Sequence, residues 1–229
     1  MRNPTPRLAL LTLAVALGLS CSRSQPDKPT PAAKAAPAAA PVAAPAPAAL
    51  IAALETARGA GLCELAAHIE MPRDAGLLGP ALDRAFALRR DELDRECSFK
   101  LLKSLQANER LHGLAAGTGD RDRWMAIVYH ANRNLRARHF DVYDLALKSA
   151  HHRVHHAVAG GLGAYGPEAE AVALLERALQ HGNENVRLKA ARSLIEIGGP
   201  EAMQILQNRS TVEKDKAVIV TIHRALNKP

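Results

Sequence analysis

Two segments that repeat after 32 residues decide the fold: residues 154–169 read VHHAVAGGLGAYGPEA, and residues 186–202 read VRLKAARSLIEIGGPEA. Both begin with valine, continue through three spacer residues and two small or apolar residues to a leucine, and end in Gly-Pro-Glu-Ala. Small residues let two helices approach closely, a glycine ends a helix in the left-handed conformation, and Pro-Glu begins the next helix. The repeat therefore predicts a helix–turn–helix unit that stacks on copies of itself.

These segments resemble the HEAT-like repeats of the phycobilin-lyase type, and the second copy is the closer match. Asn183 stands where that family has a capping aspartate. The first copy departs from the pattern, with His151 at the capping position and His155 where the second copy has Arg187. A degenerate third unit is expected over residues 212–227. The resemblance implies an all-α fold, built as a short α-solenoid of antiparallel helix pairs.

The residues upstream of the repeats are also predicted to be helical. Apolar side chains recur there at helical spacing and form one stripe, and no long stretch alternates with the period of a strand. The stripe consists of Trp124, Ile127, Val128, Ala131 and Leu135. This region cannot be assigned to repeats from its sequence. Because about three units are needed to bury a continuous core, we expect it to supply the rest of the stack.

The chain begins with the pattern of a secretory signal over residues 1–20. Arg2 and Arg7 precede an uncharged apolar run from Leu8 to Leu19. That run of about 12 residues is too short to span a bilayer core of roughly 30 Å as a helix. The pattern indicates export and not a transmembrane helix.

Residues 17–21, Leu-Gly-Leu-Ser-Cys, resemble a bacterial lipobox, in which the cysteine is acylated, with palmitate for example, and becomes the mature N-terminus. The segment departs from that family where Gly18 stands three residues before the cysteine in place of leucine. The alternative is an ordinary cleaved signal that happens to hold a cysteine. The resemblance implies lipidation of Cys21 and anchoring to a membrane. Ser22, in place of a retention aspartate, implies the outer membrane facing the periplasm more than the inner membrane.

Between this signal and the helices lies a tether, residues 21–48, that is rich in alanine and proline. Prolines block a continuous helix and favour extended conformations, so we expect a disordered spacer that holds the helical part away from the membrane. The alternative is a proline-rich ligand for another protein or for the cell wall. The resulting organisation is a signal, the lipidated tether, a helical region and HEAT-like repeats, over residues 1–20, 21–48, 49–150 and 151–229.

The net charge of +7 does not predict a nucleic-acid binder. Acidic and basic residues interleave in the helical part, as in the stretch 91–95, DELDR. A protein that binds nucleic acid usually concentrates its basic residues on one face. We therefore expect no nucleic-acid partner.

The histidines of residues 151–156, HHRVHH, are the most conspicuous candidate site. On a helix, His151 and His155 are four residues apart, which places two imidazoles on one side for a metal ion. His152 and His156 form a second such pair that points elsewhere. The alternative, which the sequence favours, is a solvated or partly packed helix face. Further ligands would have to come from other helices, which offer His130, His139 and His181.

Two cysteines, Cys63 and Cys97, remain after Cys21 is acylated. In an exported protein such a pair indicates a disulfide, and the alternative is two packed thiols on helix faces.

Catalytic motifs are absent from the sequence: it holds no nucleophile elbow, phosphate-binding glycine loop or two-cysteine metal motif. Some HEAT-repeat enzymes hold a di-iron centre through His-Glu dyads, whereas the corresponding pairs here are His155-His156 and Arg187-Leu188. We therefore predict a lipid-anchored scaffold that binds an unknown envelope protein, with no enzymatic activity, cofactor or evident small-molecule substrate. The alternatives are a metal-binding protein that uses the histidine cluster and a purely structural envelope component.

Overall fold

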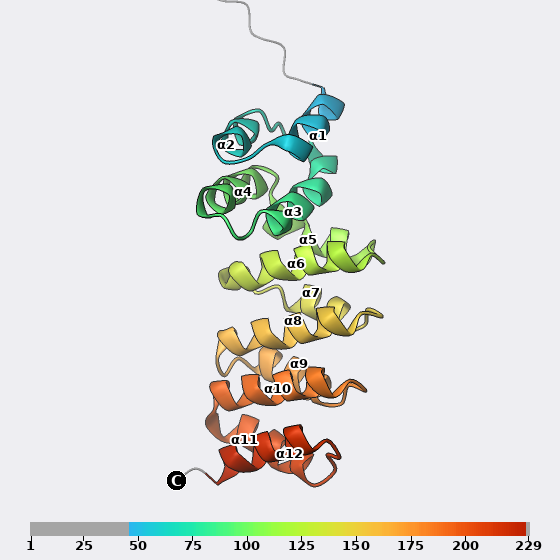
Figure 1. Ribbon diagram of the computed structural model, residues 1–229, viewed down its shortest axis with the longest axis vertical. Helices are drawn as coiled ribbons and strands as arrows, with labels where there is room; N and C mark the ends of the chain where they lie inside the picture. The colour runs from blue at the N-terminus through green and yellow to red at the C-terminus, as the bar shows by residue number, and fades with distance from the viewer. Residues whose placement is uncertain (1–45, 228–229) are drawn as a thin grey trace, which may run out of the picture. The chain divides into compact units, whose positions relative to one another are not determined.

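The computed structural model describes residues 46–227, and all regular structure in this range is helical (Figure 1). The predicted all-α fold is therefore confirmed. The signal peptide, Cys21 and the tether up to residue 45 lie outside the described residues. Among the described helices, none has the length and apolar character needed to cross a membrane.

Twelve α-helices and three short 3-10 helices make up residues 46–227. The α-helices are α1 (Pro47–Thr56), α2 (Ala60–Ala67), α3 (Leu78–Ala87), α4 (Glu92–Ser104), α5 (Ala107–Ala116), α6 (Arg121–Arg133), α7 (Phe140–Ala146), α8 (His152–Leu162), α9 (Ala169–Leu179), α10 (Glu184–Ile197), α11 (Gly199–Ser210) and α12 (Lys216–Leu226). The 3-10 helices are η1 (Ala75–Leu77), η2 (Leu135–Ala137) and η3 (Gly163–Tyr165).

Four helices, α6, α8, α10 and α12, begin at regular intervals along the chain. Their N-cap residues are Asp120, His151, Asn183 and Asp215, so the intervals are 31, 32 and 32 residues. The side chains of Asp120, Asn183 and Asp215 each accept a backbone N–H of the first turn, which satisfies a donor that has no partner inside the helix. The starts of these four helices thus follow the 32-residue period of the sequence.

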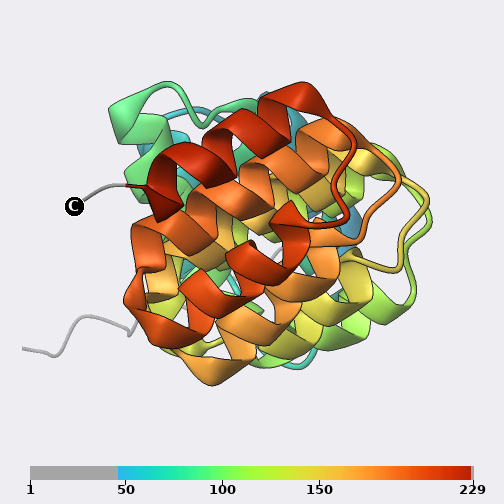
Figure 2. The same cartoon turned by 90° about the horizontal axis from the view of Figure 1, so that it is seen from below.

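These four helices form a row in which each contacts the next, α6 with α8, α8 with α10, and α10 with α12 (Figures 1 and 2). Helices α7, α9 and α11 connect them and pack against the row. At the ends of η3 and α10, Gly166 and Gly198 have φ angles of 68° and 66°. Glycine adopts such angles without a Cβ clash, which lets the chain turn into the second helix of each unit.

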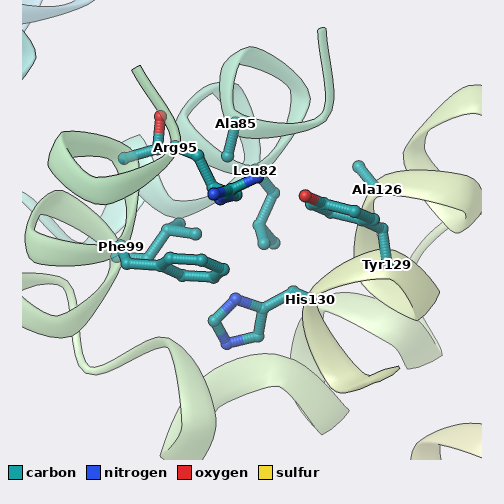
Figure 3. A pocket seen from close by; sticks show the side chains of 9 residues that line it. Leu82, Ala85, Arg95, Phe99, Ala126, Tyr129 and His130 are labelled. Carbon is teal, nitrogen blue, oxygen red and sulfur yellow. The ribbon is translucent and has the colours of Figure 1, made fainter. Parts of the chain in front are cut away.

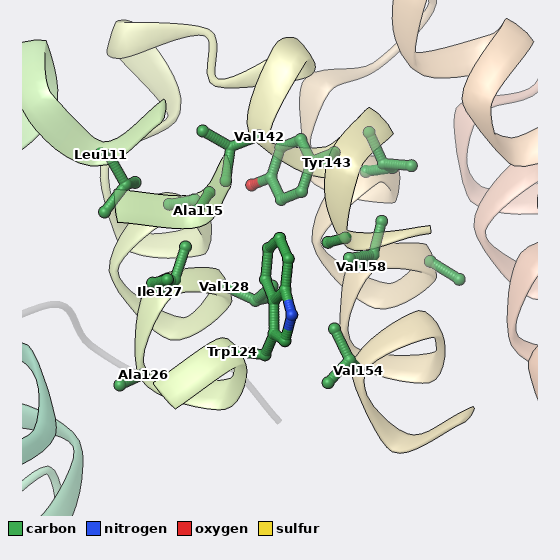
Figure 4. Close-up of a cluster of buried hydrophobic side chains, with 14 of the residues drawn as sticks. Leu111, Ala115, Trp124, Ala126, Ile127, Val128, Val142, Tyr143, Val154 and Val158 are labelled. Carbon is green, nitrogen blue, oxygen red and sulfur yellow. The ribbon is translucent and has the colours of Figure 1, made fainter. Parts of the chain in front are cut away.

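The core between α6 and α8 is organised around Trp124, which is only 4% exposed. Its indole faces Tyr143, Val154 and Val158 (Figure 4). Burying a valine such as Val154 or Val158 stabilises the fold by roughly 1.5–3 kcal/mol. Four residues of the predicted stripe are buried on α6, namely Trp124, Ile127, Val128 and Ala131. The fifth, Leu135, lies beyond the end of this helix in η2 and is half-buried.

In the N-terminal part, α2 packs on α4, and a disulfide joins Cys63 on α2 to Cys97 on α4. The two Cα atoms lie 4.6 Å apart, within the range that a disulfide spans. The bond links residues 34 positions apart in the chain, in the region that the sequence left unassigned to repeats.

Candidate functional site

The histidine cluster does not have the helical geometry that the sequence analysis assumed for His151. Helix α8 begins at His152, and His151 is its N-cap with extended backbone angles, φ −110° and ψ 100°. The Nε2 of His151 donates to the carbonyl oxygen of Gly119 over 3.0 Å. Because His151 lies outside the helix, the four-residue spacing does not place its ring beside that of His155.

His155 instead pairs with a histidine that precedes the next helix of the row. It is 4% exposed, and its Nδ1 lies 2.8 Å from Nε2 of His181. The Nδ1 of His181 accepts the backbone N–H of Asn183, so the ring proton of His181 sits on Nε2 and is donated to His155. His155 then carries its own proton on Nε2, 3.3 Å from the hydroxyl of Ser149. The network holds both imidazoles in the neutral state.

Burial lowers the pKa of His155, and the neighbouring His181 lowers it further. His155 is therefore neutral at physiological pH, in agreement with its hydrogen bonds. Each ring nitrogen of the pair that lacks a proton already accepts a hydrogen bond. Within residues 46–227, no group of three or more histidine, cysteine or acidic side chains is arranged to hold a metal ion. Metal binding by His151 and His155 remains a prediction that no contact of these residues favours.

The following junction of the row holds an ion pair in place of the two histidines. Arg187 donates to both carboxylate oxygens of Glu213, over 2.9 Å each. Arg209 and the backbone N–H groups of Lys214 and Asp215 donate to the same carboxylate. Burial raises the pKa of Glu213, but the bonds from Arg187, the backbone and Arg209 outweigh it and lower the pKa to about 2. Glu213 is thus ionised and fully bonded.

The surface of the row carries a group of basic residues, the basic strip, which consists of Arg153, His156, Lys189, Arg192 and Arg224. They lie on α8, α10 and α12, and the side chains are exposed except for that of Lys189, which is half-buried. None of the four Arg and Lys side chains forms an ion pair within residues 46–227. Burial lowers the pKa of His156, and the positive charges of Lys189 and Arg192 lower it further. Lys189 and Arg192 on α10 therefore both lie near His156 on α8.

Packing holds part of this strip in position. The Lys189 side chain passes over Gly160 on α8, so close that a Cβ on Gly160 would lie 2.8 Å from the Lys189 Cε. Because acidic and basic residues interleave along the chain, no local run of basic residues marks this surface in the sequence. The signal was the 32-residue period, which places Arg192 and Arg224 at the same position of successive helices.

Residues 142–227 match the protein family described as HEAT repeats. This stretch is a HEAT-repeat domain. The match extends from within α7 to the end of α12, so both junctions and the basic strip lie in the HEAT-repeat domain. The resemblance to HEAT-like repeats is confirmed for this part of the chain. No curated protein sequence matches the chain.

Proposed function

We propose that this protein is a lipid-anchored scaffold whose HEAT-repeat domain binds an acidic surface of another envelope protein. The observation that carries the proposal is the basic strip on the surface of α8, α10 and α12. The proposal includes no catalytic step and no cofactor.

Stacked helical repeats offer an extended surface, and proteins of this architecture typically use it to bind other proteins. A surface charge that is not paired within its own molecule attracts a partner of opposite charge and orients it during the encounter. Arg153, Arg192 and Arg224 are such charges. The ion pair of Arg187 with Glu213 is buried in the same domain, so it stabilises the packing of the helices and does not face a partner.

The anchoring part of the proposal rests on Cys21 and the tether. Acyl chains contribute on the order of 0.8 kcal/mol for each buried methylene, so several chains hold a protein firmly to a bilayer. An extended alanine- and proline-rich tether over residues 22–46, which ends where α1 begins, would reach several tens of ångströms, at about 3.1 Å per residue in the polyproline conformation. Such a reach would let the basic strip meet a partner away from the lipid surface.

Anchoring is tested with Cys21→Ser in the full chain. We expect the wild-type protein to fractionate with membranes and to carry acyl groups in mass spectrometry, and the variant to be released in soluble form. A variant that stays in the membrane fraction, or a wild type without acyl groups, would contradict the anchoring and leave the partner proposal to its own test.

Partner binding is tested by site-specific photo-cross-linking in the cell. A photoreactive residue at Leu188, half-buried on α10, is compared with one at Glu176, exposed on α9. We expect a discrete protein adduct from position 188 only, and we expect Lys189→Glu with Arg192→Glu to abolish it. The control Arg136→Glu reverses an exposed charge outside the strip and should leave the adduct. Equal adducts at both positions, or an adduct insensitive to the strip charges, would refute the strip as the binding face.

A further inference from the structure

A groove of about 340 Å³ opens between α4, α5 and α6, outside the HEAT-repeat domain. Its volume lies at the lower end of the range of pockets that bind small molecules. The residues that line it and matter to its chemistry are Phe99, Leu102, Lys103, Asn108, Glu109 and His130. The groove combines an apolar floor with a few polar groups, which is the composition of small-molecule sites.

The floor of the groove is made by Phe99 and Leu102, which, together with His130, also line a small separate chamber. Figure 3 shows the Phe99 and His130 rings next to each other at this chamber, with Tyr129 on its other side. The hydroxyl of Ser98 also lines the chamber, is 3% exposed, and has no hydrogen-bond partner within residues 46–227. This chamber of about 10 Å³ has room for about one water molecule, so a small molecule would lie in the groove and not in the chamber.

Asn108 is held with its amide nitrogen free. Asn134 Nδ2, which donates to the His130 carbonyl over 2.8 Å, lies 3.4 Å from both ring nitrogens of His130. His130 Nε2 lies 3.0 Å from Asn108 Oδ1, and because an amide oxygen only accepts, this contact places the His130 proton on Nε2. His139 Nε2 lies 3.3 Å from the same oxygen. With its oxygen occupied, Asn108 has two N–H donors on Nδ2 and no acceptor for them within residues 46–227.

The two charged residues of the groove lie at the facing ends of two helices. Lys103 is in the last turn of α4 and Glu109 in the first turn of α5, where the helix dipoles stabilise these charges. Neither forms an ion pair within residues 46–227. Lys103 and Asn108 therefore offer donors for an anionic group, and Glu109 offers an acceptor for a cationic one.

We propose that this groove binds a small aromatic carboxylate. The carboxylate is bound by the Nδ2 group of Asn108 and the ammonium of Lys103, and both hydrogen bonds are strong because the carboxylate that accepts them is ionised. The aromatic body packs on Phe99 and Leu102, where ring pairs prefer offset or edge-to-face arrangements. An amino group on the same molecule would be accepted by Glu109, so an aromatic amino acid fits all three polar contacts.

The proposal is tested with three probes on the folded protein: 3-phenylpropionate, L-phenylalanine and the uncharged 3-phenylpropanamide. Calorimetry or ligand-observed NMR should give a Kd below about 1 mM for at least one of the two carboxylates. We expect the amide to bind at least about tenfold more weakly than 3-phenylpropionate, because it lacks the anionic oxygen that Lys103 requires. Absence of binding by both carboxylates, or equal binding of 3-phenylpropionate and the amide, would overturn the proposal.

Two variants locate the binding. Lys103→Gln removes the cation at an exposed position and should weaken carboxylate binding about tenfold. Asn108→Asp keeps an oxygen for His130 and His139 but replaces the free donor with a repelling oxygen, and should weaken it at least as much. The matched control is Lys100→Gln, also on α4, where Lys100 pairs with Glu96. If Lys103→Gln leaves binding as strong as Lys100→Gln does, the site is not this groove.

Discussion

The Nδ1 of His155 lies 2.8 Å from the Nε2 of His181, at the two positions where the next junction of the row holds Arg187 and Glu213. Each of these residues stands 32 positions before its counterpart. The two junctions therefore share a backbone register and differ in chemistry, a neutral hydrogen-bonded pair in one and a buried ion pair in the other. Acid therefore destabilises both junctions, but in different pH ranges, the histidine pair at a higher pH than the ion pair.

Acidification should destabilise the histidine junction first. The pKa of His155 is lowered in the folded protein, and the ordinary histidine value of about 6.5 applies when it is unfolded. Its stabilising contribution is thus complete above about pH 6.5 and is lost as the pH falls from there towards the folded pKa. His130, His139 and His156 have lowered pKa values too and act with the same sign. Chemical unfolding at pH 7.5, 6.5 and 5.5 should give a falling free energy of unfolding.

Replacing His155 and His181 by an ion pair separates the acid-induced loss of stability at this junction from the loss caused by the other histidines. The double variant His155→Arg with His181→Glu should unfold with a smaller loss of stability between pH 7.5 and 5.5 than the wild type. Each single variant should be less stable than the double variant at pH 7.5, because it leaves a charge without its partner. An unchanged pH dependence in the double variant would show that the other histidines account for all of the loss.

Glu213→Gln should be strongly destabilising at neutral pH. The side chain of Glu213 is only 1% exposed and faces Arg187 and Arg209, so neutralising it leaves two partly buried cations without a counter-charge. Breaking a buried pair in this way costs about 3–5 kcal/mol, which lowers the melting temperature by roughly 2–4 °C per kcal/mol in a domain of this size. Thermal unfolding followed by circular dichroism measures the shift.

The pH dependence of Glu213 provides a control for that variant. Its pKa of about 2 lies below the ordinary value of 4.5, so its contribution is present above pH 4.5 and is lost between pH 4.5 and 2. The difference in stability between wild type and Glu213→Gln should therefore shrink only below about pH 4.5. A difference that shrinks near pH 6 would assign the effect to another group.

The all-helical fold could be predicted from the sequence because the 32-residue period is local and is written in residues with fixed conformational roles. Gly198 and Pro200 mark a turn, and Val186 and Leu194 mark a buried face, whatever the rest of the chain does. The period reaches back to Asp120 at the start of α6, and the helix pairing before it depends on long-range packing of α2 with α4 and of α3 with α6. Helical spacing within one segment carries no information about such pairings.

The candidate sites were harder to predict than the fold. The interpretation of His151 and His155 as two ligands on one side of a helix required α8 to include His151, and the helix starts one residue later. A boundary shift of one residue was enough to give His151 and His155 different partners. His181 could be named as a distant histidine, but its contact with His155 requires the stacked junction. The orientation of Asn108, set by residues from three segments, is likewise absent from any local pattern.

Reduction of the bond between Cys63 and Cys97 should lower stability. A disulfide that closes a loop of this length restricts the unfolded chain and contributes roughly 4 kcal/mol in the chain-entropy estimate. A soluble Cys21→Ser form should show no reactive thiol when denatured without reductant and should melt at a lower temperature after reduction. The variant with both cysteines changed to alanine should melt near the reduced form. Two reactive thiols before reduction would contradict the bond.

Replacing Gly161 and Gly113 by alanine should have opposite effects on stability. In an open helix position, alanine is favoured over glycine by up to about 1 kcal/mol, and Gly113 on α5 has no neighbour within 4 Å of the new Cβ. At Gly161 on α8 the Cβ would overlap the amide of Asn132. That amide accepts the Tyr143 hydroxyl over 2.8 Å and donates to the Ala157 carbonyl over 3.2 Å, so it cannot move without losing bonds in the core.

Gly161→Ala should therefore lose about 1–3 kcal/mol of stability, the usual cost of overpacking, whereas Gly113→Ala should gain a little. Urea unfolding of the two variants beside the wild type measures both changes under one set of conditions. Because the substitution and its effect on helix propensity are the same in both, the difference between them reports the contact of α6 with α8 alone. If Gly161→Ala were as stable as Gly113→Ala, the close approach of these two helices at Asn132 would be wrong.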